Sequence, residues 1–140
     1  MSRVFWDTNL YIYLFEGYGQ FSAATAQLRT RMLERGDQLL TSTLSLGEIL
    51  VKPMEANQKE LSEKYETAIK ATSVLLPFDV KAARIYAALR ADRTLRPPDA
   101  IQLACAASAG VDLFITNDAR LQNKHVDGIQ FIVSIERAPL

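Results

Sequence analysis

The stretch VFWDTNLYIYLFE, residues 4–16, joins two different local patterns through one acidic residue. Its first three residues, Val4 to Trp6, form a short apolar run of the length expected for a buried strand. From Leu10 to Phe15 the chain is almost continuously apolar, and we expect a helix that starts near Asn9. Asp7 stands at the junction, where its carboxylate could cap that helix or bind a metal ion. The choice between these two interpretations depends on the other acids of the chain.

Four further apolar runs have the length of buried strands, and they lie at residues 39–40, 74–76, 113–115 and 131–133. Segments with a helical spacing of apolar residues separate these runs, at residues 21–28, 61–72 and 82–89. Residues 100–109 are small and apolar on nearly every side, which predicts a central, buried helix ended by Gly110. Strands that alternate with helices predict an α/β fold with a mostly parallel sheet covered on both faces. Without repeats or linkers, residues 1–140 are expected to form one unit.

The composition fits one soluble globular domain of 140 residues and excludes several kinds of site. The 16 basic and 16 acidic side chains cancel, so a nucleic-acid partner would need a local basic patch. A single cysteine, Cys105, excludes an internal disulfide and a cysteine-rich zinc site, and we expect it in the core. A single histidine, His125, argues against histidine-cluster metal sites. With neither a signal peptide nor a membrane-spanning segment, the expected location is the cytoplasm.

Four acids fall where predicted strands end or predicted helices begin. Asp7 ends the first strand, and Asp118 follows the apolar run DLFIT. Glu48 lies at the start of the helix after the second strand, and Asp99 lies at the start of the central, buried helix. In parallel sheets covered by helices, the carboxyl ends of the strands and the N-termini of the helices meet at one edge, where ligands bind. We therefore expect the four carboxylates to converge there.

Each of these acids has a structural explanation when it is taken alone. Ser45 to Glu48 fits a capping box, and Asp99 to Gln102 fits a second one. Asp7 could cap the first helix, and such a cap contributes about 1 kcal/mol. Four converging carboxylates would repel one another, however, and Ser, Thr or Asn could cap the helices without that cost. Their joint placement therefore favours a role beyond capping.

A divalent cation would remove the repulsion among the four acids. Oxygen ligands without histidine or cysteine select magnesium or manganese. Short polar neighbours could orient the ligands and bound water, and these are Thr8, Asn9, Ser45, Thr116 and Asn117. Because no histidine is placed to act as a base, the metal ion would have to activate water. The pattern predicts metal-dependent hydrolysis of a phosphodiester.

The chain resembles PIN-domain ribonucleases, and most closely the VapC-type toxins of prokaryotic toxin–antitoxin pairs, in four segments: VFWDTNLYIYLFE, TSTLSLGEIL, RPPDAIQLACAASAG and DLFITNDARL. The segments occur in the order and spacing of that family, from about Val4 to Leu121. The resemblance implies a five-stranded parallel sheet flanked by helices. It also implies a metal-binding quartet of acids, which are Asp7, Glu48, Asp99 and Asp118. Polar residues of the family that support the quartet match Asn9, Ser45 and Thr116.

The resemblance implies an activity and partners as well. Proteins of this family cut single-stranded or looped RNA with magnesium or manganese. The toxins form homodimers, and a cognate antitoxin blocks the site. We therefore expect residues 1–140 to be a PIN-like nuclease domain, in which the four acids are both the catalytic and the metal-binding residues.

Several side chains near the acids could contact RNA. Four arginines could bind phosphates of RNA: Arg90, Arg93, Arg96 and Arg120. A position in a solvated helix end or loop explains these arginines equally well. Four aromatic residues after Asp7 could stack on bases, although packing in the core or at an interface explains them better, and these are Tyr11, Tyr13, Phe15 and Tyr18.

Two other functions stay open at this point. A non-catalytic PIN-like module would bind metal or RNA without cutting it. A phosphatase with an aspartyl nucleophile on a similar fold would need a second acid two residues after the nucleophile. This chain has Asn9 at that position, which counts against the phosphatase.

Overall fold

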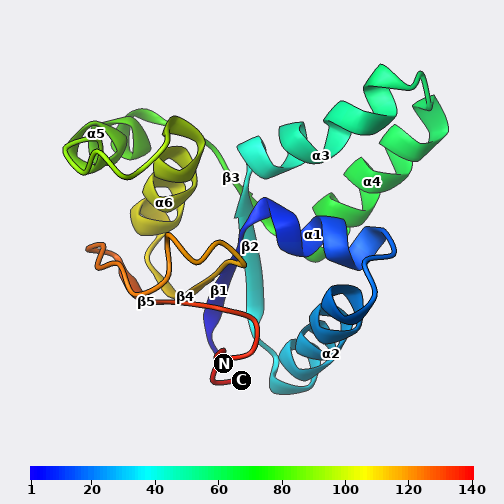
Figure 1. The fold of residues 1–140 in the computed structure, drawn as a ribbon, viewed down its shortest axis with the longest axis horizontal. Helices are drawn as coiled ribbons and strands as arrows, with labels where there is room; N and C mark the ends of the chain where they lie inside the picture. Colours follow the sequence, from blue (N-terminus) through cyan, green and yellow to red (C-terminus); the bar gives the residue numbers. More distant parts are fainter.

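Five parallel strands and six helices form the chain in a computed structural model that describes residues 1–140, with two helices between successive strands up to β4 and none between β4 and β5 (Figure 1). The strands are β1 (Arg3–Trp6), β2 (Gln38–Ser42), β3 (Val74–Leu76), β4 (Val111–Ile115) and β5 (Ile129–Val133). The helices are α1 (Thr8–Phe15), α2 (Gln20–Arg35), α3 (Thr43–Glu55), α4 (Lys59–Thr72), α5 (Val80–Leu89) and α6 (Pro97–Ala109). The predicted α/β fold is confirmed, and every neighbouring pair of strands is parallel.

Alternating side chains of the strands build a separate core on each face of the sheet. In β1, Val4 and Trp6 belong to the core that packs against α1 and α2, whereas Phe5 belongs to the core that packs against α6. Helix α5 lies outside α6 and packs on it, while α3 and α4 pack against each other on the other side of the molecule (Figure 1). Both faces of the sheet are therefore covered, as the short, continuously apolar strands predict.

The strand order β3-β2-β1-β4-β5 places a reversal of the chain path between β1 and β4. From β1 the chain moves outward through β2 to β3, and it then returns to the other side of β1 to form β4 and β5. Trp6 pairs with Ile115 at the carboxyl ends of these two strands, and the amide of Asp7 donates to the carbonyl of Ile115 at 3.0 Å. Such a reversal is where parallel α/β sheets open a crevice for ligands.

The first helix begins as the sequence indicates. The backbone amide of Thr8 donates to Oδ1 of Asp7 at 2.8 Å, so Asp7 caps α1. The helix starts at Thr8, one residue before the expected position.

Both predicted capping boxes are wrong. Helix α3 is capped by Ser42, whose hydroxyl accepts from the amide of Ser45 at 3.3 Å, and this places Glu48 in the second turn, out of reach of the helix start. Helix α6 has no side-chain cap, because Pro97 and Pro98 form its first two positions and Asp99 lies inside the first turn. The carboxylates of Glu48 and Asp99 are therefore free for other contacts.

Helix α6 is the central, buried helix that the sequence predicts. Seven of its residues are buried, Cys105 among them, and the helix ends at Gly110. No helix of this structure combines the length and the apolarity that crossing a membrane requires.

The C-terminal end of α6 lies against Gly128, directly before β5. Gly128 has φ +95°, and a Cβ atom there would lie 2.5 Å from the carbonyl oxygen of Ala107. Its own carbonyl accepts from the amide of Val111 at 2.9 Å, which joins the starts of β4 and β5. Only glycine fits both the conformation and the space.

We predict that Gly128→Ala lowers the free energy of unfolding by about 2 kcal/mol or more, because it adds both backbone strain and a backbone clash. Urea denaturation followed by circular dichroism measures the change. Gly17→Ala is the matched control, since no atom lies within 4 Å of its added Cβ. Equal stability of the two variants would contradict this account of Gly128.

Candidate metal centre

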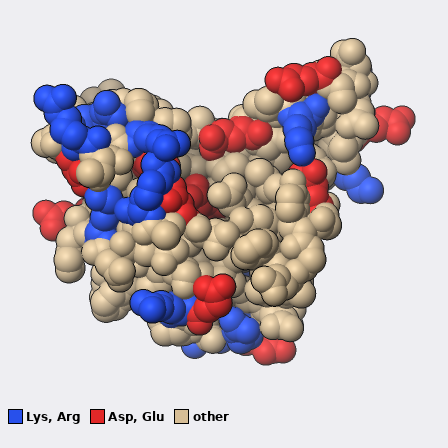
Figure 2. Space-filling model, in the orientation of Figure 1, with Lys and Arg blue, Asp and Glu red and all other residues tan.

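The four predicted acids line one cavity of about 330 Å³ at the carboxyl edge of the sheet. Asp7 follows β1, Asp118 follows β4, Glu48 lies in the second turn of α3, and Asp99 lies in the first turn of α6. Figure 2 shows acidic side chains in the hollow between the α5–α6 side and the α3 side of the molecule. The rest of the cavity wall is formed by Thr8, Asn9, Ile12, Pro98 and Gln102.

Asp7 is the most enclosed of these acids. Its Oδ1 accepts from the amide of Thr8 at 2.8 Å, and its Oδ2 accepts from the hydroxyl of Thr116 at 2.7 Å. Burial raises the pKa of the Asp7 carboxyl; these two hydrogen bonds oppose that rise, and the nearby charges of Asp99 and Glu48 add to it. A bound cation would offset both the burial and the repulsion, so Asp7 has the surroundings of a metal ligand.

Glu48 is positioned by α1. The hydroxyl of Thr8 donates to Oε1 of Glu48 at 2.6 Å, so the residue after Asp7 orients the second acid. This contact fixes Glu48 on the same side of the cavity as Asp7.

Beneath these two acids lies a buried hydrogen-bonded cluster, which we call the polar floor and which consists of Thr8, Thr41, Ser42, Ser45 and Gln102. The side-chain amide of Gln102 donates to the hydroxyl of Thr8 at 3.0 Å and to that of Ser45 at 2.7 Å, and it accepts from the hydroxyl of Ser42. Gln102 is only 2% exposed. It links α1, α3 and α6 below the acids.

The sequence does not predict this role of Gln102, because the capping box that would pair it with Asp99 does not form. The sequence nonetheless contains one indication that Gln102 has buried hydrogen-bond partners. Gln102 is the one long polar side chain within the buried segment 100–109, and a buried amide needs partners.

Asp99 and Asp118 contact a guanidinium group. Nε of Arg120 donates to Oδ1 of Asp118 at 3.0 Å, and Nη2 donates to Oδ2 of Asp118 and, at 3.5 Å, to Oδ2 of Asp99. The hydrogen bond from Arg120 lowers the pKa of the Asp118 carboxyl, and the charge of Arg96 contributes less. Asp99 and Asp118 thus share one positive charge that the protein itself supplies.

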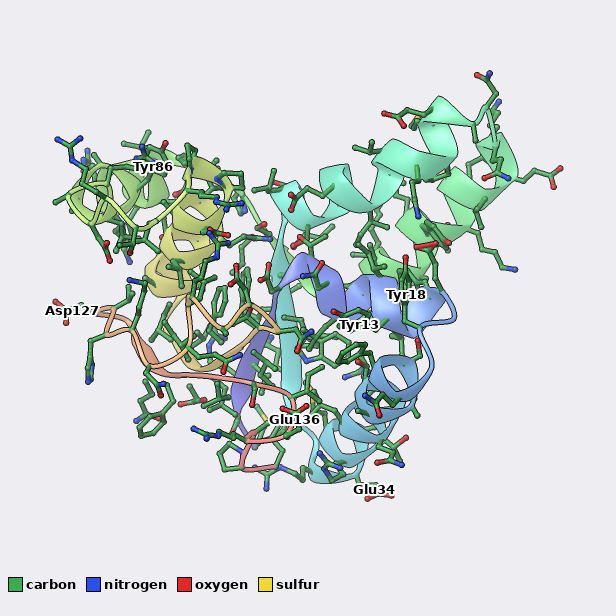
Figure 3. All side chains as sticks on the ribbon, in the orientation of Figure 1. Tyr13, Tyr18, Glu34, Tyr86, Asp127 and Glu136 are labelled. Atoms are coloured by element: carbon green, nitrogen blue, oxygen red, sulfur yellow. The ribbon has the colours of Figure 1, made fainter.

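The predicted supporting residues fall into three groups. Thr8 and Thr116 donate to carboxylates, and Ser45 belongs to the polar floor. Asn9 lines the cavity without a hydrogen bond to an acid. Asn117 is directed elsewhere, because its amide donates to the hydroxyl of Tyr13 at 2.9 Å. Tyr13 lies beside Tyr18 in an aromatic group, with ring centroids 5.7 Å apart (Figure 3).

The donor set fits a magnesium or manganese ion, since it consists of carboxylate and hydroxyl oxygens. No three of the His, Cys, Asp and Glu side chains lie close enough together to enclose an ion by themselves. This spacing suits an ion that keeps several waters and takes one or two carboxylates directly, as magnesium does. Of the four acids, Asp7 and Glu48 line the cavity without a positively charged partner.

A basic margin lies next to the cavity on the α5–α6 side, and it consists of Arg90, Arg93, Arg96, Arg120 and Lys124. Figure 2 shows Lys and Arg side chains gathered on this side of the molecule. Nη1 of Arg90 donates to the carbonyl of Leu95 at 3.1 Å and so shapes the loop. The side chains of Arg93 and Arg96 are exposed and make no hydrogen bond or ion pair within the chain.

Comparison with known proteins gives a family and similar folds. The sequence model of the PIN-domain family matches residues 4–126 of this chain. The structure of VapBC2 from Rickettsia felis bound to a promoter DNA fragment has a TM-score of 0.73 and is 14% identical to this chain. The match covers 94% of this chain and 97% of that chain. A toxin–antitoxin complex from Klebsiella pneumoniae is 25% identical (91% and 95% covered, TM-score 0.65). DNA-bound VapBC from Salmonella typhimurium is 20% identical (96% and 99% covered, TM-score 0.67). No curated protein matches the chain.

We predict that Gln102→Leu lowers the free energy of unfolding by about 1–3 kcal/mol, because it leaves the hydroxyls of Ser42, Ser45 and Thr8 without their buried partner. Urea denaturation measures this loss. Gln130→Leu is the control, since Gln130 is exposed on β5 and its side chain makes no hydrogen bond. An equal effect of both substitutions would show that the polar floor does not stabilise the fold.

Proposed function

The chain belongs to the PIN-domain family, and from that premise we propose that it is a metal-dependent endoribonuclease, the toxin of a toxin–antitoxin pair. Proteins of this family are in general nucleases that depend on divalent metal ions. The observation that carries the proposal is the convergence of Asp7, Glu48, Asp99 and Asp118, from four separate elements, on one cavity. A module that binds only RNA has no need to gather four like charges at that cost.

In this proposal the acids of the cavity hold magnesium or manganese, with Asp7 and Glu48 as the first candidates for direct ligands. Such an ion, when bound, supplies activation of water and offsets the charge that develops at the phosphorus. The chain supplies the positions of the ligands. Thr8 and Thr116 hold carboxylates through hydrogen bonds. Beneath them, the polar floor fixes the positions of α1, α3 and α6 relative to one another.

The substrate would be a phosphodiester of RNA that approaches over the basic margin. Arg93 and Arg96 are free to bind phosphates, because they are exposed and have no partner within the chain. Arg90 and Arg120, by contrast, already donate to a backbone carbonyl and to acids of the cavity. Among the four arginines that the sequence marks, Arg93 and Arg96 are therefore the better candidates for RNA contacts.

The proposal also includes a cognate antitoxin and a homodimer, both expected in the cytoplasm. Support for the antitoxin comes from the similar solved structures, which are VapBC or toxin–antitoxin complexes. The homodimer rests on the resemblance of the four sequence segments to VapC-type toxins.

We expect the wild-type protein to cleave a broad pool of RNA with magnesium or manganese and not with a chelator. Asp7→Asn should slow cleavage by at least about 100-fold, because it removes a charged metal ligand. Asparagine caps helices as well as aspartate does, so the substitution should leave α1 intact. Cleavage is followed by gel electrophoresis of labelled RNA.

The control for this prediction is Asp79→Asn. Asp79 caps α5 by accepting from the amide of Ala82 at 2.9 Å, and it lies outside the cavity. This variant should cleave RNA at the rate of the wild type. Equal cleavage by the wild type and Asp7→Asn, or cleavage by neither under any condition, would rule out the catalytic proposal.

We predict that the double substitution Arg93→Gln and Arg96→Gln weakens binding of single-stranded RNA to the Asp7→Asn protein. The slope of a plot of log affinity against log salt concentration should become less negative by about 1.4. This is about 0.7 for each of the two phosphates that are no longer neutralised. Fluorescence anisotropy of a labelled oligonucleotide gives this slope. Lys59→Gln with Lys64→Gln, on α4, removes the same charge away from the cavity, and an equal effect there would exclude a specific role for the basic margin.

A further inference from the structure

The four carboxylates of the cavity divide into two pairs with different partners. Asp7 and Glu48 accept hydrogen bonds from neutral donors only, namely the amide of Thr8 and the hydroxyls of Thr8 and Thr116. Asp99 and Asp118 share the guanidinium of Arg120. One pair therefore has no positively charged partner, whereas the other pair already has a cation.

Arg120 contacts two acids from different elements at once, as a bound cation would. Its guanidinium uses two nitrogens on the two oxygens of Asp118, and Nη2 extends to Asp99, which belongs to a different element. Such a fork matches a carboxylate better than a lysine ammonium does. The guanidinium thus bridges α6 and the segment after β4, as an ion between those two acids would.

The backbone holds Arg120 in this position. The amide of Arg120 donates to Oδ1 of Asp118 at 3.0 Å, and the amide of the next residue, Leu121, donates to the carbonyl of Asp118 at 3.1 Å. Leu121 is 1% exposed and anchors the turn in the core. The guanidinium is therefore tethered within reach of the acids at little cost in chain entropy.

The pairing is nonetheless open to exchange. The side chain of Arg120 is 44% exposed, while those of Asp99 and Asp118 are 19% and 22% exposed. Ion pairs at this level of exposure are weak, because water competes for both partners. A divalent ion carries twice the charge and can displace the guanidinium when its concentration is high enough.

We propose that Arg120 is a built-in cation that competes with divalent metal for Asp99 and Asp118. This inference rests on the proposed function, because it concerns the same acids. At low metal concentration the resting protein binds its first divalent ion on the side of Asp7 and Glu48. Further metal reaches Asp118 only when the Arg120 side chain leaves.

The test is titration of metal-free protein with manganese, followed by calorimetry and by the electron paramagnetic resonance signal of free manganese. We expect Arg120→Gln to bind manganese roughly threefold to tenfold more tightly than the wild type, or to bind a second ion per chain. Arg120→Lys, which keeps the charge and loses the fork, should lie between the two. Arg84→Gln removes the same charge from an exposed site on α5 and should match the wild type within about twofold.

Thermal unfolding gives a second readout. In chelator, Arg120→Gln should unfold at a lower temperature than the wild type, because the guanidinium that offsets part of the repulsion among the four carboxylates is then gone. Manganese should raise its unfolding temperature more than it raises that of the wild type. If Arg120→Gln does not fold, the same comparison is made with Arg120→Lys.

The outcomes separate the two proposals. Manganese binding by the wild type with equal or weaker binding by Arg120→Gln would overturn the role of Arg120 and leave the nuclease proposal standing. Absence of manganese binding by every variant would overturn the metal-dependent function, and the role of Arg120 with it.

Discussion

The parallel pairing of β1 with β4 is the contact on which the site depends. These strands come from opposite ends of the chain, yet Trp6 pairs with Ile115 and the amide of Asp7 donates to the carbonyl of Ile115. This register brings the residue after β1 level with the residues after β4, so that the hydroxyl of Thr116 reaches Asp7. A slip of one residue would turn Asp7 to the other face of the sheet. The chemistry of the cavity is thus fixed by backbone hydrogen bonds in the core.

Gathering carboxylates at one edge also requires neutral donors that hold them without cancelling their charge. Threonine hydroxyls and a helix amide do this for Asp7 and Glu48, and the buried amide of Gln102 supports one of those threonines. Because the donors are themselves buried and fully partnered, the acids are held in place before any ion binds. Pre-organisation of this kind separates a binding site from a chance cluster of surface acids.

The strands and the edge at which the acids meet were predictable, although the two capping boxes were not. Each of the five apolar runs is a strand, and the general geometry of parallel sheets was enough to bring Asp7, Glu48, Asp99 and Asp118 to one cavity. Partners far apart in the chain were not predictable, because nothing in the order of residues specifies them. The amide of Asn117 meets Tyr13, 104 residues away, and Gln102 meets Thr8, 94 residues away. Ser42 replaced Ser45 as a cap because β2 continues through Ser42 and sets where α3 begins.

The contact of Lys124 with Asp92 has a consequence for the rim of the cavity. Nζ of Lys124 donates to Asp92 at 2.8 Å and to Thr94 at 2.9 Å, so the segment between α5 and α6 is fastened to the segment after β4. The first segment carries Arg93 and Arg96, and the second carries Arg120. The two loops, and the arginines they carry, are therefore held near each other by contacts that stay open to solvent.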